Sequence, residues 1–117
     1  MTESTEGAKT LLHPVSDLDR AKAIYAALLG IEPQTDGPYY VGFDTGGQHI
    51  GLVPDGGPQG RKVPVAYWHV ADIEAKVAEV TAAGATVAEA PHDVGGGRLV
   101  ATVTDADGNV LGLLQDA

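Results

Sequence analysis

Histidine is the residue type in this chain best suited to acid–base or metal chemistry, and three of the four histidines, His13, His49 and His69, lie on predicted strands. His49 stands two residues before Gly51 in the stretch DTGGQHIGLV, and His69 closes the stretch VPVAYWH. Imidazole ionises near neutral pH, so these side chains are candidates for a general base, a proton donor or a ligand contact. The chain has no cysteine, which excludes a thiolate nucleophile, a disulfide framework and a Cys-type zinc site.

The other two histidines, His13 and His92, have no assigned role. Strand alternation places His13 and Trp68 on the face that the helices cover, opposite to His49 and His69. His92 opens the stretch HDVGGGR, residues 92–98, which predicts a hairpin loop whose function stays open.

Glycine recurs inside two strand-like runs where it should weaken the strand. Gly51 interrupts an apolar run after a Gly-rich turn, and Gly112 does the same in DADGNVLGLL. Glycine in a strand interior costs conformational entropy and offers no side chain for packing. Two interpretations remain open: the glycines enlarge the floor of a pocket, or they mark bulges.

The elements that position these residues form two copies of one unit. LLHPVSDLDRAKAIYAALLG parallels AYWHVADIEAKVAEVTAAGA, and each copy continues into a Gly-turn strand. The pattern predicts βαβββ twice, an α+β fold. The predicted boundaries are a disordered tail at 1–8 and one domain at 9–117, with module 1 at about 9–54, a linker at 55–63 and module 2 at about 64–115.

Capping residues set the expected helix ends. The first helix is predicted to begin at Ser16 or Asp17 and to end at Gly30, and the second to run from Asp72 to near Gly84. Pro33 limits a short strand near 31–35 to a sheet edge. The first helix is expected to turn an apolar stripe to the sheet, made of Leu18, Ala21, Ile24, Tyr25 and Leu28.

Charge and length restrict the class of protein and of partner. The chain has 117 residues and a net charge of −9, which argues against nucleic acid and anionic membrane surfaces and favours a small-molecule ligand, with a mild preference for cations. No run is long enough to span a membrane and no secretory segment is present, so we expect a cytoplasmic protein.

Three motifs follow one another along the chain: PVSDLDRAKAIYAALLG, YWHVADIEAKVAEVTAAGA and DADGNVLGLL. In this order they resemble the vicinal-oxygen-chelate superfamily of glyoxalases, bleomycin-resistance proteins and extradiol dioxygenases. The resemblance implies two modules whose curved mixed sheets face each other around a pocket, in a homodimer. It also implies metal-ligand positions, occupied in the metalloenzymes by His and Glu, at Thr10, Val65, Gly51 and Gly112. None of these four residues suits a divalent metal, so we expect neither a metal nor another cofactor.

Alternation and the resemblance together give an expected ligand-binding set, in which His69 and His49 are also the candidate catalytic residues. Its members are Thr10, Leu12, Tyr40, His49, Gly51, Val65, Tyr67, His69 and Gly112. The first functional hypothesis is a metal-free protein that binds or sequesters a hydrophobic, aromatic or cationic compound, as in drug resistance of the bleomycin type. The alternative is a glyoxalase-like lyase or isomerase, or a dioxygenase-related enzyme, that uses His69, His49 or an unorthodox metal site. A third hypothesis is an interaction module with a vestigial pocket.

Overall fold

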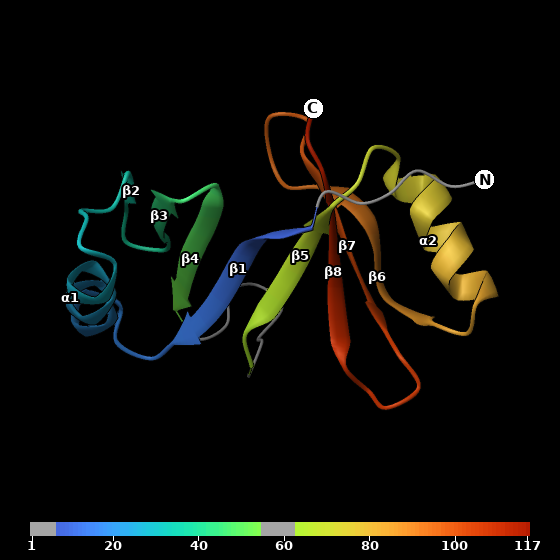
Figure 1. The fold of residues 1–117 in the computed structure, drawn as a ribbon, viewed down its shortest axis with the longest axis horizontal. Helices are drawn as coiled ribbons and strands as arrows, with labels where there is room; N and C mark the ends of the chain where they lie inside the picture. Colours follow the sequence, from blue (N-terminus) through green and yellow to red (C-terminus); the bar gives the residue numbers. More distant parts are fainter. Residues whose placement is uncertain (1–6, 55–62) are drawn as a thin grey trace. The chain divides into compact units, whose positions relative to one another are not determined.

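The secondary structure repeats one order of elements twice, as predicted. The computed structural model of the chain describes residues 7–54 and 63–117 (Figure 1). The first copy holds β1 (Ala8–Val15), α1 (Leu18–Leu29), β2 (Thr35–Asp36), β3 (Val41–Thr45) and β4 (Gln48–Pro54). The second copy holds β5 (Val65–His69), α2 (Ile73–Ala82), β6 (Thr86–Asp93), β7 (Leu99–Thr104) and β8 (Val110–Gln115). The βαβββ repeat and the α+β class are therefore confirmed.

The chain divides into two compact units, residues 10–65 and residues 66–117 with the chain up to Lys9. In the first unit the strands are ordered β2-β3-β4-β1, and in the second β5-β8-β7-β6. The pairs β1–β4 and β5–β8 are parallel, and the other pairs within each unit are antiparallel. Each unit thus contains a mixed sheet in which the first strand of the copy lies parallel to the last.

Helix α1 covers one face of the first sheet. Asp17 caps the helix by accepting a hydrogen bond from the Arg20 backbone N–H at 3.1 Å. Gly30 ends it in the left-handed conformation, with φ of 73°, which glycine adopts without the steric penalty of a Cβ. The buried core between helix and sheet consists of Ala21, Val41, Phe43, Ile50 and Leu52.

The apolar stripe of α1 is rotated from the predicted one. Ile24 and Leu28 are 59% and 77% exposed, so the prediction that they pack on the sheet is wrong. The helix instead contacts the core through Leu18, Ala21, Tyr25, Ala26 and Leu29. Both stripes have helical spacing, and only the position of the helix over the sheet decides between them.

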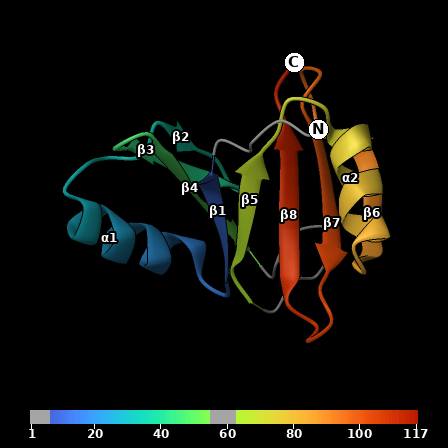
Figure 2. The same ribbon diagram turned by 45° about the vertical axis from the view of Figure 1, so that its right-hand side comes forward.

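Helix α2 covers one face of the second sheet, where it lies against β6 and β7 (Figure 2). Asp72 caps it by accepting from the Ala75 N–H at 3.1 Å, and Ile73 directly after the cap is fully buried. Ile73 joins a core with Val70, Ala101 and Leu113, against which Trp68 packs, as expected from alternation.

Several smaller elements differ from the predictions or refine them. The short edge strand after Pro33 comprises only Thr35–Asp36, later than the expected 31–35. β1 begins at Ala8, inside the predicted tail, and the Gly7 carbonyl accepts a hydrogen bond from the His69 N–H at 3.1 Å. The predicted linker lies outside the described residues, apart from residue 63. Among the described residues, no helix is long and apolar enough to cross a membrane.

Candidate functional site

The face of the first sheet opposite α1 carries the predicted ligand-binding residues of that unit. Leu11 and Val15 pack under the helix, so alternation turns Thr10 and Leu12 to the other face. The parallel register then pairs Thr10 with His49 and Leu12 with Gly51. The predicted residues of the first unit therefore share one face, and Tyr40 joins them from just before β3.

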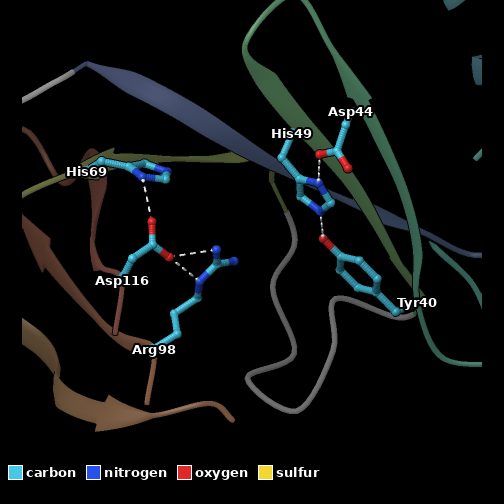
Figure 3. A network of polar contacts seen from close by, with 6 residues as sticks. All are labelled: Tyr40, Asp44, His49, His69, Arg98 and Asp116. Carbon is cyan, nitrogen blue, oxygen red and sulfur yellow. Dashed lines mark hydrogen bonds and ion pairs between the residues drawn. The ribbon is translucent and has the colours of Figure 1, made fainter. Parts of the chain in front are cut away.

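Three of these side chains form a hydrogen-bonded chain (Figure 3). The Tyr40 hydroxyl lies 2.5 Å from His49 Nε2, and His49 Nδ1 lies 2.7 Å from Asp44 Oδ1. The rings of Tyr40 and His49 are nearly parallel, with an interplanar angle of 8°. Asp44 stands opposite His49 in the antiparallel β3–β4 register. Strand alternation predicted Tyr40 and His49 for this site but not Asp44, whose position opposite His49 follows from counting back from the Gly46-Gly47 turn.

The chemistry of the three side chains decides which of them donates and which accepts in each hydrogen bond. An ionised carboxylate can only accept, so His49 Nδ1–H donates to Asp44. His49 Nε2 then carries the lone pair, and the Tyr40 hydroxyl donates to it. The imidazole is thus oriented by a carboxylate on one side and holds a phenol proton on the other.

Two glycines make room for this arrangement. Gly42 and Gly51 are direct cross-strand partners. A Cβ on Gly51 would lie 2.7 Å from Tyr40 Cζ, and a Cβ on Gly42 would lie 2.7 Å from His49 Cε1. Both distances are too short for carbon atoms in contact. The Tyr40 and His49 rings therefore occupy the space that side chains at these positions would fill.

In the second unit, too, a tyrosine ring occupies the space beside a strand glycine. Trp68 packs in the helix-covered core, so Val65, Tyr67 and His69 turn to the opposite face. Tyr67 pairs with Gly112, and a Cβ there would lie 2.5 Å from Tyr67 Cδ2. The interpretation that the strand glycines enlarge a pocket floor is therefore wrong as stated, because a tyrosine ring covers each of them.

His69 lies beside a charged pair at the end of the chain. Its Nδ1 is 3.6 Å from Asp116 Oδ2, and Arg98 binds Asp116 Oδ1 through Nε at 2.8 Å and Nη2 at 2.7 Å (Figure 3). Asp116 is thus engaged by a permanent cation, and the distance to His69 exceeds that of a direct hydrogen bond.

Glu89, a carboxylate that was not predicted for the site, lies on the same face of the second sheet. Glu89 pairs with Thr102, whose hydroxyl donates to Glu89 Oε1 at 2.9 Å, and Thr102 is almost fully buried. The β6–β7 register shifts on both sides of Glu89. Such bulges reverse the alternation of a strand, so counting from Val87 would have placed Glu89 on the helix side.

The remaining histidines lie apart from these groups. His13 contacts the Tyr25 ring of α1, with ring centroids 5.4 Å apart, and so faces the helix as predicted. Its Nδ1 is buried and forms no hydrogen bond, and burial lowers the pKa of His13. His92 Nδ1 donates to the Ala90 carbonyl at 2.9 Å, a local contact on β6 next to the hairpin loop.

The four positions at which the family resemblance places metal ligands carry no suitable donor group. Thr10 and Val65 are buried, and Gly51 and Gly112 lie under tyrosine rings. Within residues 7–54 and 63–117, no three His, Asp or Glu side chains are grouped as a metal site requires. Thr10, Val65, Gly51 and Gly112 thus do not supply the donor set that a divalent metal requires.

A shallow groove of about 590 Å³ lies elsewhere in the first unit, between α1 and β2. It is lined by alanines of the helix and by Lys22, Ile31 and Asp36. Lys22 and Asp36 form an ion pair at 3.2 Å. The groove holds no histidine and lies on the helix side of the sheet, away from Tyr40 and His49.

Comparison with known proteins identifies the family. The model of the Glyoxalase/Bleomycin resistance protein/Dioxygenase superfamily matches residues 8–113, so the chain belongs to this superfamily. No curated protein sequence matches it significantly.

Solved structures share the fold at low identity. A hypothetical protein from Bacillus halodurans has a TM-score of 0.77 at 18% identity, with 98% of this chain and 96% of that chain covered. A methylmalonyl-CoA epimerase from Mycobacterium tuberculosis has a TM-score of 0.73 at 16% identity, with coverages of 97% and 89%. A structure described as an NAD-dependent benzaldehyde dehydrogenase from Legionella pneumophila has a TM-score of 0.75 at 14% identity, with coverages of 92% and 98%. These likenesses show the fold, and the varied names show that the fold alone selects no activity.

Proposed function

We propose that this protein binds a hydrophobic or aromatic small molecule, including cationic compounds, without the divalent metal of its family. It would sequester the compound as bleomycin-resistance proteins do. The observation that carries the proposal is that Thr10, Val65, Gly51 and Gly112 stand where the resemblance implies metal ligands. In each last strand a glycine lies under a tyrosine ring where the family's carboxylate would project.

Tyrosine suits a small-molecule site because it combines a flat apolar ring with a polar tip. Tyr40 lies over Gly51 in the first unit and Tyr67 over Gly112 in the second. The net charge of −9 favours cationic over anionic compounds at long range.

A thermal-shift experiment on the chelator-treated full chain tests the absence of the metal. Mn²⁺, Fe²⁺, Co²⁺, Ni²⁺ and Zn²⁺ are added singly, and we expect the melting temperature to stay unchanged. A ligand of the folded state at 100 times its Kd would stabilise by about 2.7 kcal/mol, several degrees for a domain of this size. A clear rise that is lost in His49→Ala or His69→Ala would overturn the metal-free proposal. The same assay with aromatic and cationic compounds then searches for the ligand.

The second candidate function is catalysis by a glyoxalase-like lyase or isomerase. The chain of Asp44, His49 and Tyr40 favours it, because a carboxylate-oriented imidazole next to a phenol is an arrangement used for proton transfer. Turnover that collapses in His49→Ala while His69→Ala and the circular dichroism spectrum stay normal would support this candidate. If His49→Ala and His69→Ala both turn over substrate at the wild-type rate, His49 is not the base of the reaction.

We also propose a homodimer, in line with the family. The exposed apolar side chains of Ile24 and Leu28 on α1 are available for such a contact. Sedimentation equilibrium measures the mass directly, and a monomer at all concentrations would contradict this proposal.

A further inference from the structure

The hydrogen-bonded chain on the first sheet has one end in solvent and the other on the sheet. Asp44 is 62% exposed at its side chain, and His49 is 25% exposed. Tyr40 is half-buried, with its hydroxyl directed at His49 and its ring lying over Gly51. The order of groups is carboxylate, imidazole and hydroxyl, the order in which hydrolases activate a serine.

The sheet around Tyr40 and His49 leaves room for their rings. Gly42 and Gly51 are cross-strand partners, so two glycines lie side by side in strand interiors, where glycine is ordinarily unfavourable. A single alanine at either position would collide with the Tyr40 or His49 ring. The two glycines therefore admit the Tyr40 and His49 rings to this face of the sheet, where any side chain at these positions would exclude them.

We propose that Tyr40 exchanges a proton with a weakly acidic hydroxyl group of a bound ligand, with His49 as the proton acceptor and Asp44 as the positioning residue. This inference rests on the proposed function, the binding of a small molecule, and specifies the class of ligand: phenols and enols. Tyr40 is the group that contacts the ligand, and Asp44 acts only through His49.

The proton transfer is balanced within the site. The ligand O–H bond breaks and its proton forms a bond to Tyr40 Oη, while the original Tyr40 proton moves to His49 Nε2. The products are a ligand oxyanion, a neutral Tyr40 and an imidazolium ion paired with Asp44. No electron is transferred and the total charge of the ligand and the protein is unchanged. The net charge of −9 therefore opposes the step less than it would oppose the binding of a preformed anion.

The environment of the hydroxyl fits an aromatic ligand body. A Cβ on Gly51 would lie 2.7 Å from Leu12 Cδ2 as well as against Tyr40, so the leucine methyl group and the phenol tip lie side by side. An apolar ring could contact Leu12 while its hydroxyl reaches Tyr40. A small number of polar groups among apolar ones is typical of ligand sites.

The test uses 4-nitrophenol, whose phenolate has a visible absorption band that the neutral phenol lacks. The full chain is added to the probe at a pH below the pKa of the free probe, and the phenolate band of the bound probe is measured. We expect a phenolate-to-phenol ratio about tenfold above that of the free probe, equivalent to one pKa unit. Tyr40→Phe and His49→Gln should bind the probe with the ratio of free solution, and Asp44→Asn should lower the ratio.

Controls separate proton transfer from general electrostatics and from misfolding. Asp19→Asn makes the same charge change at an exposed position of α1 and should leave the ratio as in the wild type. Tyr40→Phe retains the ring over Gly51, and circular dichroism checks the fold of every variant. An enhanced ratio that persists in Tyr40→Phe would overturn the proposal, as would a probe that fails to bind wild-type protein at millimolar concentration. Neither result affects the metal and compound screen that tests small-molecule binding itself.

Discussion

The substitution Gly51→Ala should destabilise the protein, although alanine normally favours folding over glycine. At an unhindered site the change stabilises by about 0.4–1 kcal/mol, because alanine has less conformational entropy to lose. Here the new Cβ would lie 2.7 Å from both Tyr40 Cζ and Leu12 Cδ2. Overpacking of this kind costs about 1–3 kcal/mol, and displacement of Tyr40 from His49 adds about 1 kcal/mol for the lost hydrogen bond. The expected net loss is about 2 kcal/mol.

Urea unfolding at neutral pH measures this loss as a lower midpoint at an unchanged slope. With a slope of about 1.5 kcal/mol/M, the midpoint should fall by about 1.3 M. Gly37→Ala is a matched control, because a Cβ there would lie 3.6 Å from the Tyr40 carbonyl oxygen, an ordinary contact. The control should remain within about 0.5 kcal/mol of the wild type.

A double-mutant cycle tests the reasoning most directly. In a Tyr40→Ala background the obstructing ring is absent and Leu12 can move, so Gly51→Ala should become neutral or stabilising by about 0.5 kcal/mol. The sign of the effect thus depends on the Tyr40 ring. If Gly51→Ala is equally destabilising with and without that ring, the ring does not occupy the space above the glycine.

Three further predictions concern the helix caps, a buried histidine and a turn. Asp17→Ala and Asp72→Ala should each lower the free energy of unfolding by about 0.5–2 kcal/mol, because each removes the acceptor for a first-turn N–H; urea unfolding measures both, and no loss would contradict the capping role. Burial lowers the pKa of His13, so the unfolded state binds more protons: stability should fall as pH drops below about 6.5. His13→Gln should flatten that slope between pH 5 and 7 in urea unfolding, and an unchanged slope would refute the assignment. Asp105→Ala should lower the melting temperature, since Asp105 accepts from Asn109 Nδ2 and N, both at 2.9 Å, across the β7–β8 turn. Hydrogen bonds from Asn109 lower the pKa of Asp105, so the contribution of Asp105 to stability is lost as pH falls through that lowered pKa. Equal melting temperatures of wild type and Asp105→Ala at neutral pH would contradict this role.

The strongest regularity of the two units is a tyrosine ring over a strand glycine. In the first unit the tyrosine comes from the segment before β3, and in the second from β5 itself. The two rings thus reach equivalent glycines from different elements, and Tyr40 continues into a histidine and a carboxylate. The equivalence of the strand glycines therefore does not extend to the elements that supply the tyrosines.

The sequence by itself determined the repeated order of elements, because the signals involved are local. Asp17 and Asp72 cap helices through contacts within three residues, and Gly30 ends one through its own backbone conformation. Alternation along short, regular strands also placed His13 and Trp68 under the helices and His49 on the opposite face. In each case the physical cause acts within a few residues, so no knowledge of the fold was needed.

Only the tertiary structure decided which residues of those elements are buried and which side chains from distant segments contact each other. The packing of α1 selected Tyr25 and Leu29 for the core and left Ile24 and Leu28 in solvent, although both pairs fit a helical stripe. Bulges in β6 turned Glu89 toward Thr102 against simple alternation. The glycine at 51 was visible in the sequence, but the Tyr40 ring that fills its space comes from another segment of the chain. Contacts between distant segments depend on register and packing, which no local pattern encodes.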